Sequence, residues 1–125
     1  MLFRSHTLSH LNAVTCVGLG VKCHLSGLET LQFKETNRLE AIKNELNKLG
    51  IYSSIENKCI NIPSTQQLKP SNKPISTYGD HRMAMAFAPL SLKTNELNID
   101  NPLVVKKSYP EFWNDLSNAG FIIQK

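Results

Sequence analysis

The stretch NRLEAIKNELNKLGIYSSIENKCINI, residues 37–62, decides the fold class because its apolar period changes halfway along. Its first half predicts a helix over residues 37–49, with Thr36 as N-cap and Gly50 as C-terminal stop. The apolar residues that place this helix recur at the spacing of one helical face and are Leu39, Ile42, Leu46 and Leu49. The second half predicts strands and therefore combines with the helix in an α/β unit.

On either side of this stretch, the helical and the strand-like spacing of apolar residues predict the other elements. Residues 51–55 and 58–62 read as two strands joined in a hairpin at residues 56–57. Further strands are expected over residues 21–25, 29–33, 75–78, 97–99 and 121–123. The polar, proline-containing residues 63–73 read as a surface loop. Strand pairs mixed with helices predict an α/β domain with a mixed sheet.

Three more helices are expected around these strands. The small apolar residues 13–19 read as the last turns of one helix. A second helix is predicted over residues 80–92, capped by Asp80 and interrupted at Pro89. A last helix over residues 110–118 is predicted to turn three residues inward: Phe112, Leu116 and Ala119.

Composition limits the class of protein. The chain has 125 residues, of which 41% are hydrophobic and 19% charged, so we expect one folded domain. No apolar run approaches the ~20 residues that span a bilayer, and residues 1–11 lack a secretory signal pattern, so no membrane association is expected. The net charge of +4 indicates either a mildly basic surface or anion binding. The basic residues are scattered, which argues against a nucleic-acid face.

The cysteines and histidines give no sign of a metal site. Cys16, Cys23 and Cys59 are too few and too widely spaced for a disulfide framework. None pairs with a histidine at ligand spacing, so no structural metal is expected. Three thiols in apolar surroundings favour a reducing compartment, the cytoplasm.

The first polar stretch with chemical potential is KETNR, residues 34–38, at the start of the predicted helix. Helix N-termini hold anions, and Lys34 and Arg38 add two full charges there. The alternative is an ordinary cap with Glu35 in the first turn, where a carboxylate is favoured in any case.

The second stretch is YGDHRMAM, residues 78–85, which again opens a helix with charged side chains. Arg82 can hold a carboxylate or phosphate with two parallel hydrogen bonds. His81 can donate a hydrogen bond or move a proton, and Asp80 can cap the helix or orient a cation. The alternative is a structural histidine followed by two methionines that pack in the core.

The third stretch is KKSYP, residues 106–110, at a predicted strand-to-helix junction. One of its lysines, Lys107, can reach an anionic ligand, or the junction can simply be solvated. Three basic helix starts in one small domain predict a pocket for a small, multiply charged anion. Glu35 lies among them as a candidate general acid or base.

Taken together, KETNRL (34–39), DHRMAM (80–85) and KSYP (107–110) in this order resemble the 5-enolpyruvylshikimate-3-phosphate synthase (3-phosphoshikimate 1-carboxyvinyltransferase) family. The resemblance covers roughly residues 13–125. It implies an α/β fold, the two-lobed inside-out barrel of the enolpyruvyl transferases. This chain would hold only the C-terminal βαβαββ unit and parts of its neighbours.

The resemblance also implies an activity and roles for particular residues. The family transfers the enolpyruvyl group of phosphoenolpyruvate to the 5-hydroxyl of shikimate 3-phosphate and releases phosphate, in chorismate and aromatic amino acid biosynthesis, without a metal or organic cofactor. Lys34 matches a contact to shikimate 3-phosphate, and Glu35 matches the proton donor to the methylene carbon. Asp80 and His81 match neighbours of this site, with His81 beside Glu35 in catalysis. Three cations match positions that hold phosphoenolpyruvate: Arg38, Arg82 and Lys107.

One departure concerns the start of the chain. Residues 1–28 contain no Asp or Glu, so the aspartate that the family uses as base is missing. We expect residues 1–12 to be an extension foreign to the family, from a truncated reading frame, and residues 13–125 to be a partial domain. Alone, this chain is expected to be inactive, whereas the full-length family enzyme is expected to be a monomer.

Two other functions stay open at this point. A UDP-N-acetylglucosamine enolpyruvyl transferase shares the implied fold but not the DHRM stretch. A non-catalytic basic module that binds anions or RNA would also account for the net charge, although the sequence shows no aromatic platform for bases.

Overall fold

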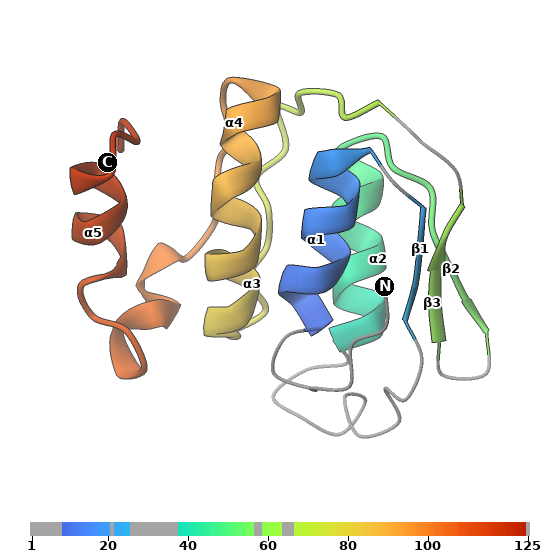
Figure 1. Ribbon diagram of the computed structural model, residues 1–125. Coiled ribbons are helices and arrows are strands. Elements are labelled where there is room, and N and C mark those ends of the chain that lie inside the picture. Colours follow the sequence, from blue (N-terminus) through green and yellow to red (C-terminus); the bar gives the residue numbers. More distant parts are fainter. Residues whose placement is uncertain (1–8, 21, 26–37, 57–58, 64–66, 125) are drawn as a thin grey trace.

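The computed structural model describes residues 9–20, 22–25, 38–56, 59–63 and 67–124. The expected strand at residues 29–33 and the expected cap Thr36 lie outside these residues. Three strands and a series of helices make up the described part (Figure 1). They are α1 (Ser9–Leu19), β1 (Cys23–Leu25), α2 (Arg38–Lys48), β2 (Ser54–Glu56), β3 (Cys59–Ile62), α3 (His81–Phe87), η3 (Ala88–Leu90), α4 (Ser91–Thr94), η4 (Pro102–Lys107) and α5 (Phe112–Asn118).

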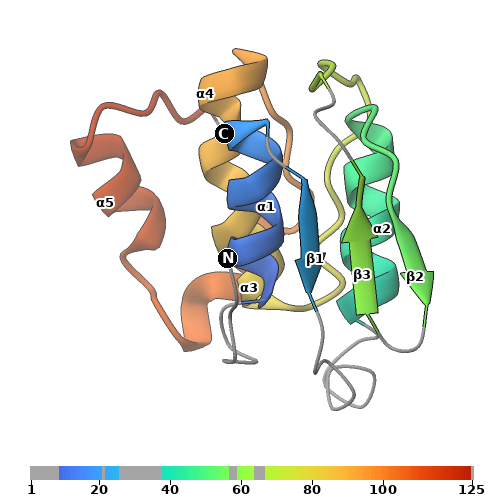
Figure 2. The same cartoon turned by 45° about the vertical axis from the view of Figure 1, so that its right-hand side comes forward.

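The strands form an antiparallel sheet in the order β1-β3-β2, with the predicted hairpin between β2 and β3. Alternation along the strands places Cys23, Ile60 and Ile62 in the core and leaves His24 and Asn61 exposed. The helices cover only one face of this sheet (Figures 1 and 2). The expected mixed sheet is therefore wrong for the described strands, which all pair antiparallel.

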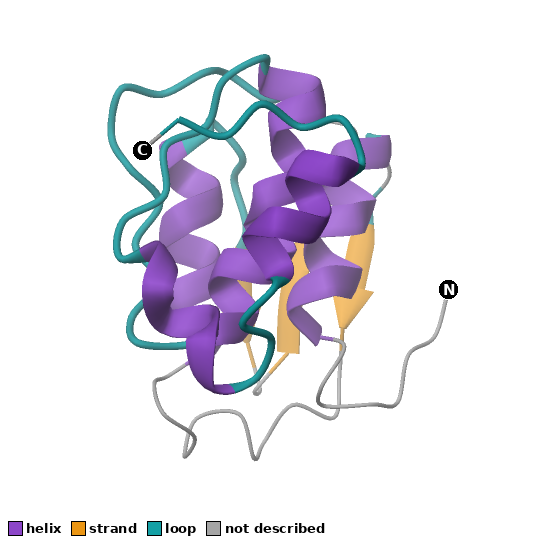
Figure 3. Cartoon of the chain, turned by 90° about the vertical axis from the view of Figure 1, so that its left-hand side faces the viewer, coloured by secondary structure: helices purple, strands orange, loops and turns teal. Residues whose placement is uncertain are grey.

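Helix α2 confirms the residues from which the fold class was predicted. The four apolar positions of the predicted helix are each 0% exposed: Leu39, Ile42 and Leu46 within α2, and Leu49 directly after its last residue. The helix ends where Gly50 adopts a φ of 81°, a left-handed conformation that glycine takes without steric cost. Helices α1 and α3 pack side by side on the same core, and seen from the α5 side the helices lie in front of the strands (Figure 3).

The helix expected over residues 80–92 is broken at its proline, as predicted. Pro89 cannot donate a backbone hydrogen bond, so the α-helix α3 gives way to the 3-10 helix η3, which contains Pro89. Helix α4 follows directly after η3. The described residues of the loop at 63–73 contain no helix or strand, which also agrees with the prediction.

The strands expected at residues 75–78 and 97–99 shrink to one parallel bridge between Ile75 and Ile99. Ile75 N–H donates to the Asn98 carbonyl at 2.8 Å, and Asp100 N–H donates to the Ile75 carbonyl at 2.8 Å. The pairing stops there because the chain turns: Thr77 is the next residue that faces the partner strand, and its carbonyl accepts the Asp80 N–H at 2.8 Å instead.

The C-terminal predictions are partly wrong. Helix α5 forms but contains no buried residue: Phe112 and Leu116 are half-buried and Ala119 is exposed. Phe112 packs edge-on against Trp113, with ring centroids 4.8 Å apart, rather than in the core. No strand forms at residues 121–123, because Phe121 N–H turns back to the Leu116 carbonyl and closes the helix end. No helix in the described part of the chain is long and apolar enough to cross a membrane.

Candidate functional site

Helices α1, α2 and α3 begin at the same end of the molecule (Figures 1 and 2). Arg38 is the first residue of α2, and Arg82 is the second residue of α3. Two of the basic helix starts singled out in the sequence therefore lie at one end of the fold. Helix N-termini carry a partial positive charge, so this end is suited to an anionic ligand.

The start of α3 is built by a tight turn over residues 77–80. Tyr78 and Gly79 have φ angles of 55° and 69°, both left-handed. Asp80 N–H donates to the Thr77 carbonyl at 2.8 Å and closes the turn. The chain thus reverses direction immediately before the charged triplet, so that the triplet occupies the first turn of α3.

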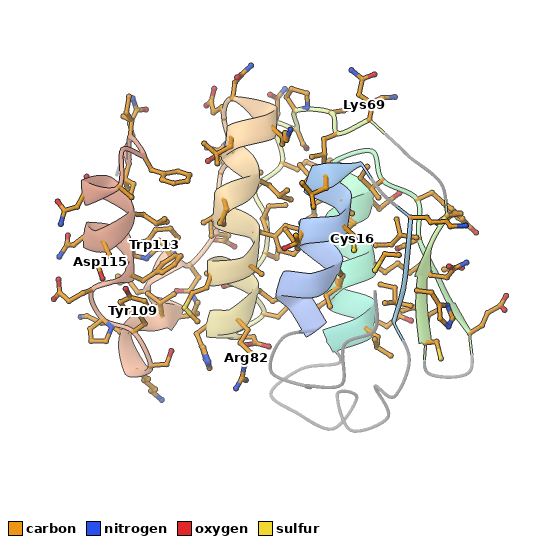
Figure 4. The ribbon with its side chains drawn as sticks, viewed as in Figure 1. Cys16, Lys69, Arg82, Tyr109, Trp113 and Asp115 are labelled. Atoms are coloured by element: carbon orange, nitrogen blue, oxygen red, sulfur yellow. The ribbon has the colours of Figure 1, made fainter. Side chains whose placement is uncertain are left out.

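Asp80 is the N-cap of α3, as predicted. Its side chain is 0% exposed, and its Oδ1 accepts a hydrogen bond from the Arg82 backbone N–H at 2.9 Å. His81 and Arg82 are half-exposed beside this buried carboxylate. Figure 4 shows the Arg82 side chain extending beyond the end of α3. A guanidinium held in this way can bind a carboxylate or phosphate with two parallel hydrogen bonds.

A buried carboxylate, Glu45, anchors the segment that leads into this turn. Glu45 is 0% exposed and accepts hydrogen bonds at Oε1 from the Ser76 N–H at 2.6 Å and from Lys48 Nζ at 2.7 Å. At Oε2 it accepts the Tyr78 hydroxyl at 2.9 Å. Burial, followed by the hydrogen bond to Glu45, raises the pKa of Tyr78, so its phenol stays a protonated donor.

Lys48 extends the same network. Its Nζ also donates to the Pro74 carbonyl at 3.0 Å and lies 3.3 Å from the Ser76 hydroxyl. We refer to Glu45, Lys48, Ser76 and Tyr78 as the Glu45 cluster. Sequence reasoning missed it, although Glu45 lies three residues after the buried Ile42, on the flank of the apolar face. A carboxylate at that position followed by a lysine three residues later was the available signal.

On its other side the turn is tied to the segment before η4. The hydroxyl of Thr77, a residue 2% exposed, donates to the Asn101 carbonyl at 3.4 Å. Helix η4 packs against α3. The turn that presents Arg82 is thus bonded to α2 on one side and to residues near η4 on the other.

The structure places the other predicted residues as follows. Lys34 and Glu35 lie outside the described residues, and of Arg38 only the backbone position is described. Lys107 is exposed and is the last residue of η4, so the junction expected between a strand and a helix instead joins a 3-10 helix to α5. Its tight turn is closed by hydrogen bonds to the Val105 carbonyl. Among the described residues, no group of three His, Cys, Asp or Glu side chains could hold a metal ion.

Comparisons with known proteins agree with this architecture. The family model for EPSP synthase (3-phosphoshikimate 1-carboxyvinyltransferase) matches residues 10–116. A 3-phosphoshikimate 1-carboxyvinyltransferase of Bacteroides fragilis (strain YCH46) is 45% identical over 118 residues, which are 94% of this chain and 29% of that protein. The enzyme of the same name from Aquifex aeolicus is 41% identical over 93 residues, 74% of this chain and 21% of that protein.

A solved structure supports the fold. An EPSP synthase from Acinetobacter baumannii superimposes with a TM-score of 0.70 at 23% identity, covering 89% of this chain and 27% of that one. The chain therefore spans less than a third of the length of the relatives it matches. The described helices and antiparallel sheet are a fragment of the enolpyruvyl transferase fold, and the chain belongs to the EPSP synthase (3-phosphoshikimate 1-carboxyvinyltransferase) family.

Proposed function

We propose that this chain forms the C-terminal part of a 3-phosphoshikimate 1-carboxyvinyltransferase. The complete enzyme transfers the enolpyruvyl group of phosphoenolpyruvate to the 5-hydroxyl of shikimate 3-phosphate and releases inorganic phosphate. The observation that carries the proposal is the start of α3, where the buried Asp80 caps the helix and Arg82 extends into solvent. We infer the substrates of this site from the family to which the chain belongs.

The chemistry runs by addition and then elimination. Glu35 donates a proton to the methylene carbon of phosphoenolpyruvate, and the 5-hydroxyl oxygen bonds to the adjacent carbon and loses its proton to a base. The resulting tetrahedral ketal phosphate then loses a methyl proton and expels phosphate, which restores the carbon–carbon double bond. Phosphoenolpyruvate carries several negative charges, so cations at Arg38, Arg82 and Lys107 lower the energy of binding and of the transition state.

The remaining roles follow from the same proposal. Lys34 contacts shikimate 3-phosphate, and His81 acts beside Glu35, held by its place next to the Asp80 cap. The reaction needs no metal or organic cofactor, because the steps are proton transfers and an anion departure. We place the enzyme in the cytoplasm, as a monomer when complete, with no nucleic-acid or membrane partner.

This chain alone is proposed to be inactive, because catalysis requires both substrates to be held against a base that residues 1–28 do not supply. We propose residues 13–125 as the partial domain and residues 1–12 as an extension; the family match begins within that extension, at residue 10. The division falls within α1, which runs from Ser9 to Leu19.

The test restores the missing part. The N-terminal portion of the Bacteroides fragilis relative is joined to this chain, and phosphate release and product are measured with phosphoenolpyruvate and shikimate 3-phosphate. The 125-residue chain alone is the control, and UDP-N-acetylglucosamine replaces shikimate 3-phosphate in a second arm. We expect activity in the restored chain with shikimate 3-phosphate only. A folded restored chain that acts on the sugar nucleotide, or on neither acceptor, would overturn the proposal.

A further inference from the structure

We propose that Glu45 and Tyr78 are positioning residues, which hold the turn before α3 so that Arg82 lies in register with the start of α2. This inference rests on the proposed function for the identity of the ligand, phosphoenolpyruvate. The positioning itself is a property of the fold and is open to measurement without activity.

Burying Glu45 in the fold has a cost in free energy that its hydrogen-bond partners must offset. A carboxylate that is 0% exposed is strongly destabilising unless its oxygens accept hydrogen bonds. Glu45 accepts three: one from Lys48 on its own helix and two from Ser76 and Tyr78, which lie 31 and 33 residues further along the chain. Two of its three partners therefore belong to the segment that leads to α3.

Tyr78 has an unfavourable backbone conformation. Its φ of 55° lies in the left-handed region, which a residue with a side chain enters only at some cost. The hydrogen bond from its hydroxyl to Glu45 opposes that cost. Tyr78 is two residues before the Asp80 cap, so a change in the tyrosine changes the direction in which α3 starts.

Glu45 is also connected through α2 to Arg38. Glu45 lies in the same 11-residue helix that Arg38 begins, and an α-helix transmits position rigidly over two turns. The Glu45 cluster therefore joins the helix that begins with Arg38 to the turn that presents Arg82. Two apolar side chains of the same volume could stabilise this contact equally well. They would not direct the backbone at Ser76, whose N–H is one of the three donors.

The test uses the restored full-length chain with Tyr78→Phe and Glu45→Gln, two substitutions that keep the shape of the side chains. The matched control is Tyr52→Phe, at a tyrosine that is 62% exposed and outside the cluster. Amide hydrogen exchange is measured along the chain, together with kcat and with KM for both substrates. A fold loss is recognised by faster exchange in β3, whose strand hydrogen bonds join it to β1 and β2 and not to the segment that holds Tyr78.

We expect amides of residues 76–83 to exchange at least about tenfold faster in Tyr78→Phe and Glu45→Gln, with β3 and the control unchanged. We expect KM for phosphoenolpyruvate to rise roughly tenfold, since displacements near 1 Å weaken a positioned contact to that extent or more. KM for shikimate 3-phosphate is expected to stay within about twofold.

Exchange at residues 76–83 that is unchanged, or that rises equally throughout the chain, would overturn the positioning role. Local acceleration with an unchanged KM for phosphoenolpyruvate would overturn it as well, because the turn would then move without effect on the ligand. If the restored parent chain has no activity, the proposed function fails, and the exchange measurement still decides whether Glu45 and Tyr78 hold the turn.

Discussion

Asp80 and Arg82 are joined by a hydrogen bond from the Arg82 backbone N–H to Asp80 Oδ1, at 2.9 Å. One residue thus supplies a fully buried carboxylate to the helix end, while the other, bonded to it through its backbone, extends a guanidinium into solvent (Figure 4). The cap fixes the backbone of Arg82 without consuming its side chain. This separation of the structural role of Asp80 from the proposed ligand-binding role of Arg82 underlies the first two predictions.

Asp80→Ala is expected to lower the free energy of unfolding by about 1–2 kcal/mol, because the first turn of α3 loses its N-cap. Asp80→Asn retains an acceptor oxygen and should keep most of that stability. Urea unfolding of both variants checks the expectation. Equal stability of the alanine variant and the parent chain would show that the cap contributes nothing.

Arg82→Ala is expected to raise KM for phosphoenolpyruvate about a hundredfold in the restored enzyme, as loss of a bidentate charged contact of roughly 3 kcal/mol implies. Arg82→Lys keeps the charge but not the fork of donors, so an intermediate value is expected. Steady-state kinetics with varied phosphoenolpyruvate measures both. Kinetics like those of the parent would reject a role for Arg82 in binding.

Glu35→Gln is expected to reduce kcat about a hundredfold or more while leaving KM for both substrates within about twofold, because an amide cannot donate the proton that the methylene carbon requires. Single-turnover measurement of phosphate release separates this chemical step from product release. An unchanged kcat counts against Glu35 as the acid.

Gly79→Ala is expected to lower the free energy of unfolding by about 1–2 kcal/mol, because its φ of 69° is unfavourable for a residue with a Cβ. No atom lies within 4 Å of an added Cβ, so backbone strain is the sole cause in the described structure. Gly18→Ala is the matched control.

At Gly18 an added Cβ would make an ordinary contact with Leu90 at 3.4 Å. Within α1 an alanine is a better helix former than glycine by about 0.5–1 kcal/mol, so the control should be stabilised. Thermal unfolding measures both changes, and effects of the same sign at the two glycines would contradict the argument.

Cys23 predicts how stability depends on pH. Burial, followed by a hydrogen bond to Cys16, raises the pKa of this thiol from 9.0 to about 12. The folded chain thus keeps a proton that the unfolded chain loses above pH 9.0. The contribution of Cys23 to stability is complete below pH 9.0 and declines as pH rises from there toward about 12.

The measurement is urea unfolding between pH 8 and pH 10.5, which flanks the ordinary thiol pKa of 9.0, for the parent chain and Cys23→Ala. The parent should lose stability more steeply with pH than the variant. Cys59→Ala, at a half-buried cysteine, serves as control and should keep the slope of the parent. Identical slopes in parent and Cys23→Ala would show that the buried thiol is not responsible.

Local sequence patterns predicted most of the helices and the hairpin, and they failed where an element depends on distant partners. Helix α2 was predictable because four buried apolar residues recur in the sequence at the spacing of one helical face. The expected strand after Ile75 was not realised, because the Thr77 carbonyl accepts the Asp80 N–H in a turn instead of a hydrogen bond from a partner strand. The inward face expected for α5 was wrong because its aromatic residues pack on one another.

The candidate site likewise has features that the local sequence predicts and features that depend on the tertiary fold. Asp80 as cap and Arg82 beside it follow from the residue types around one helix start, where short-range hydrogen bonds decide the outcome. The placement of the α2 and α3 starts at one end, and the burial of Glu45 between Lys48 and Tyr78, arise only when the chain folds. Glu45 and Tyr78, 33 positions apart, come into contact because a buried carboxylate is stable only when it accepts hydrogen bonds. The local periodicity of the sequence does not indicate which distant residues donate them.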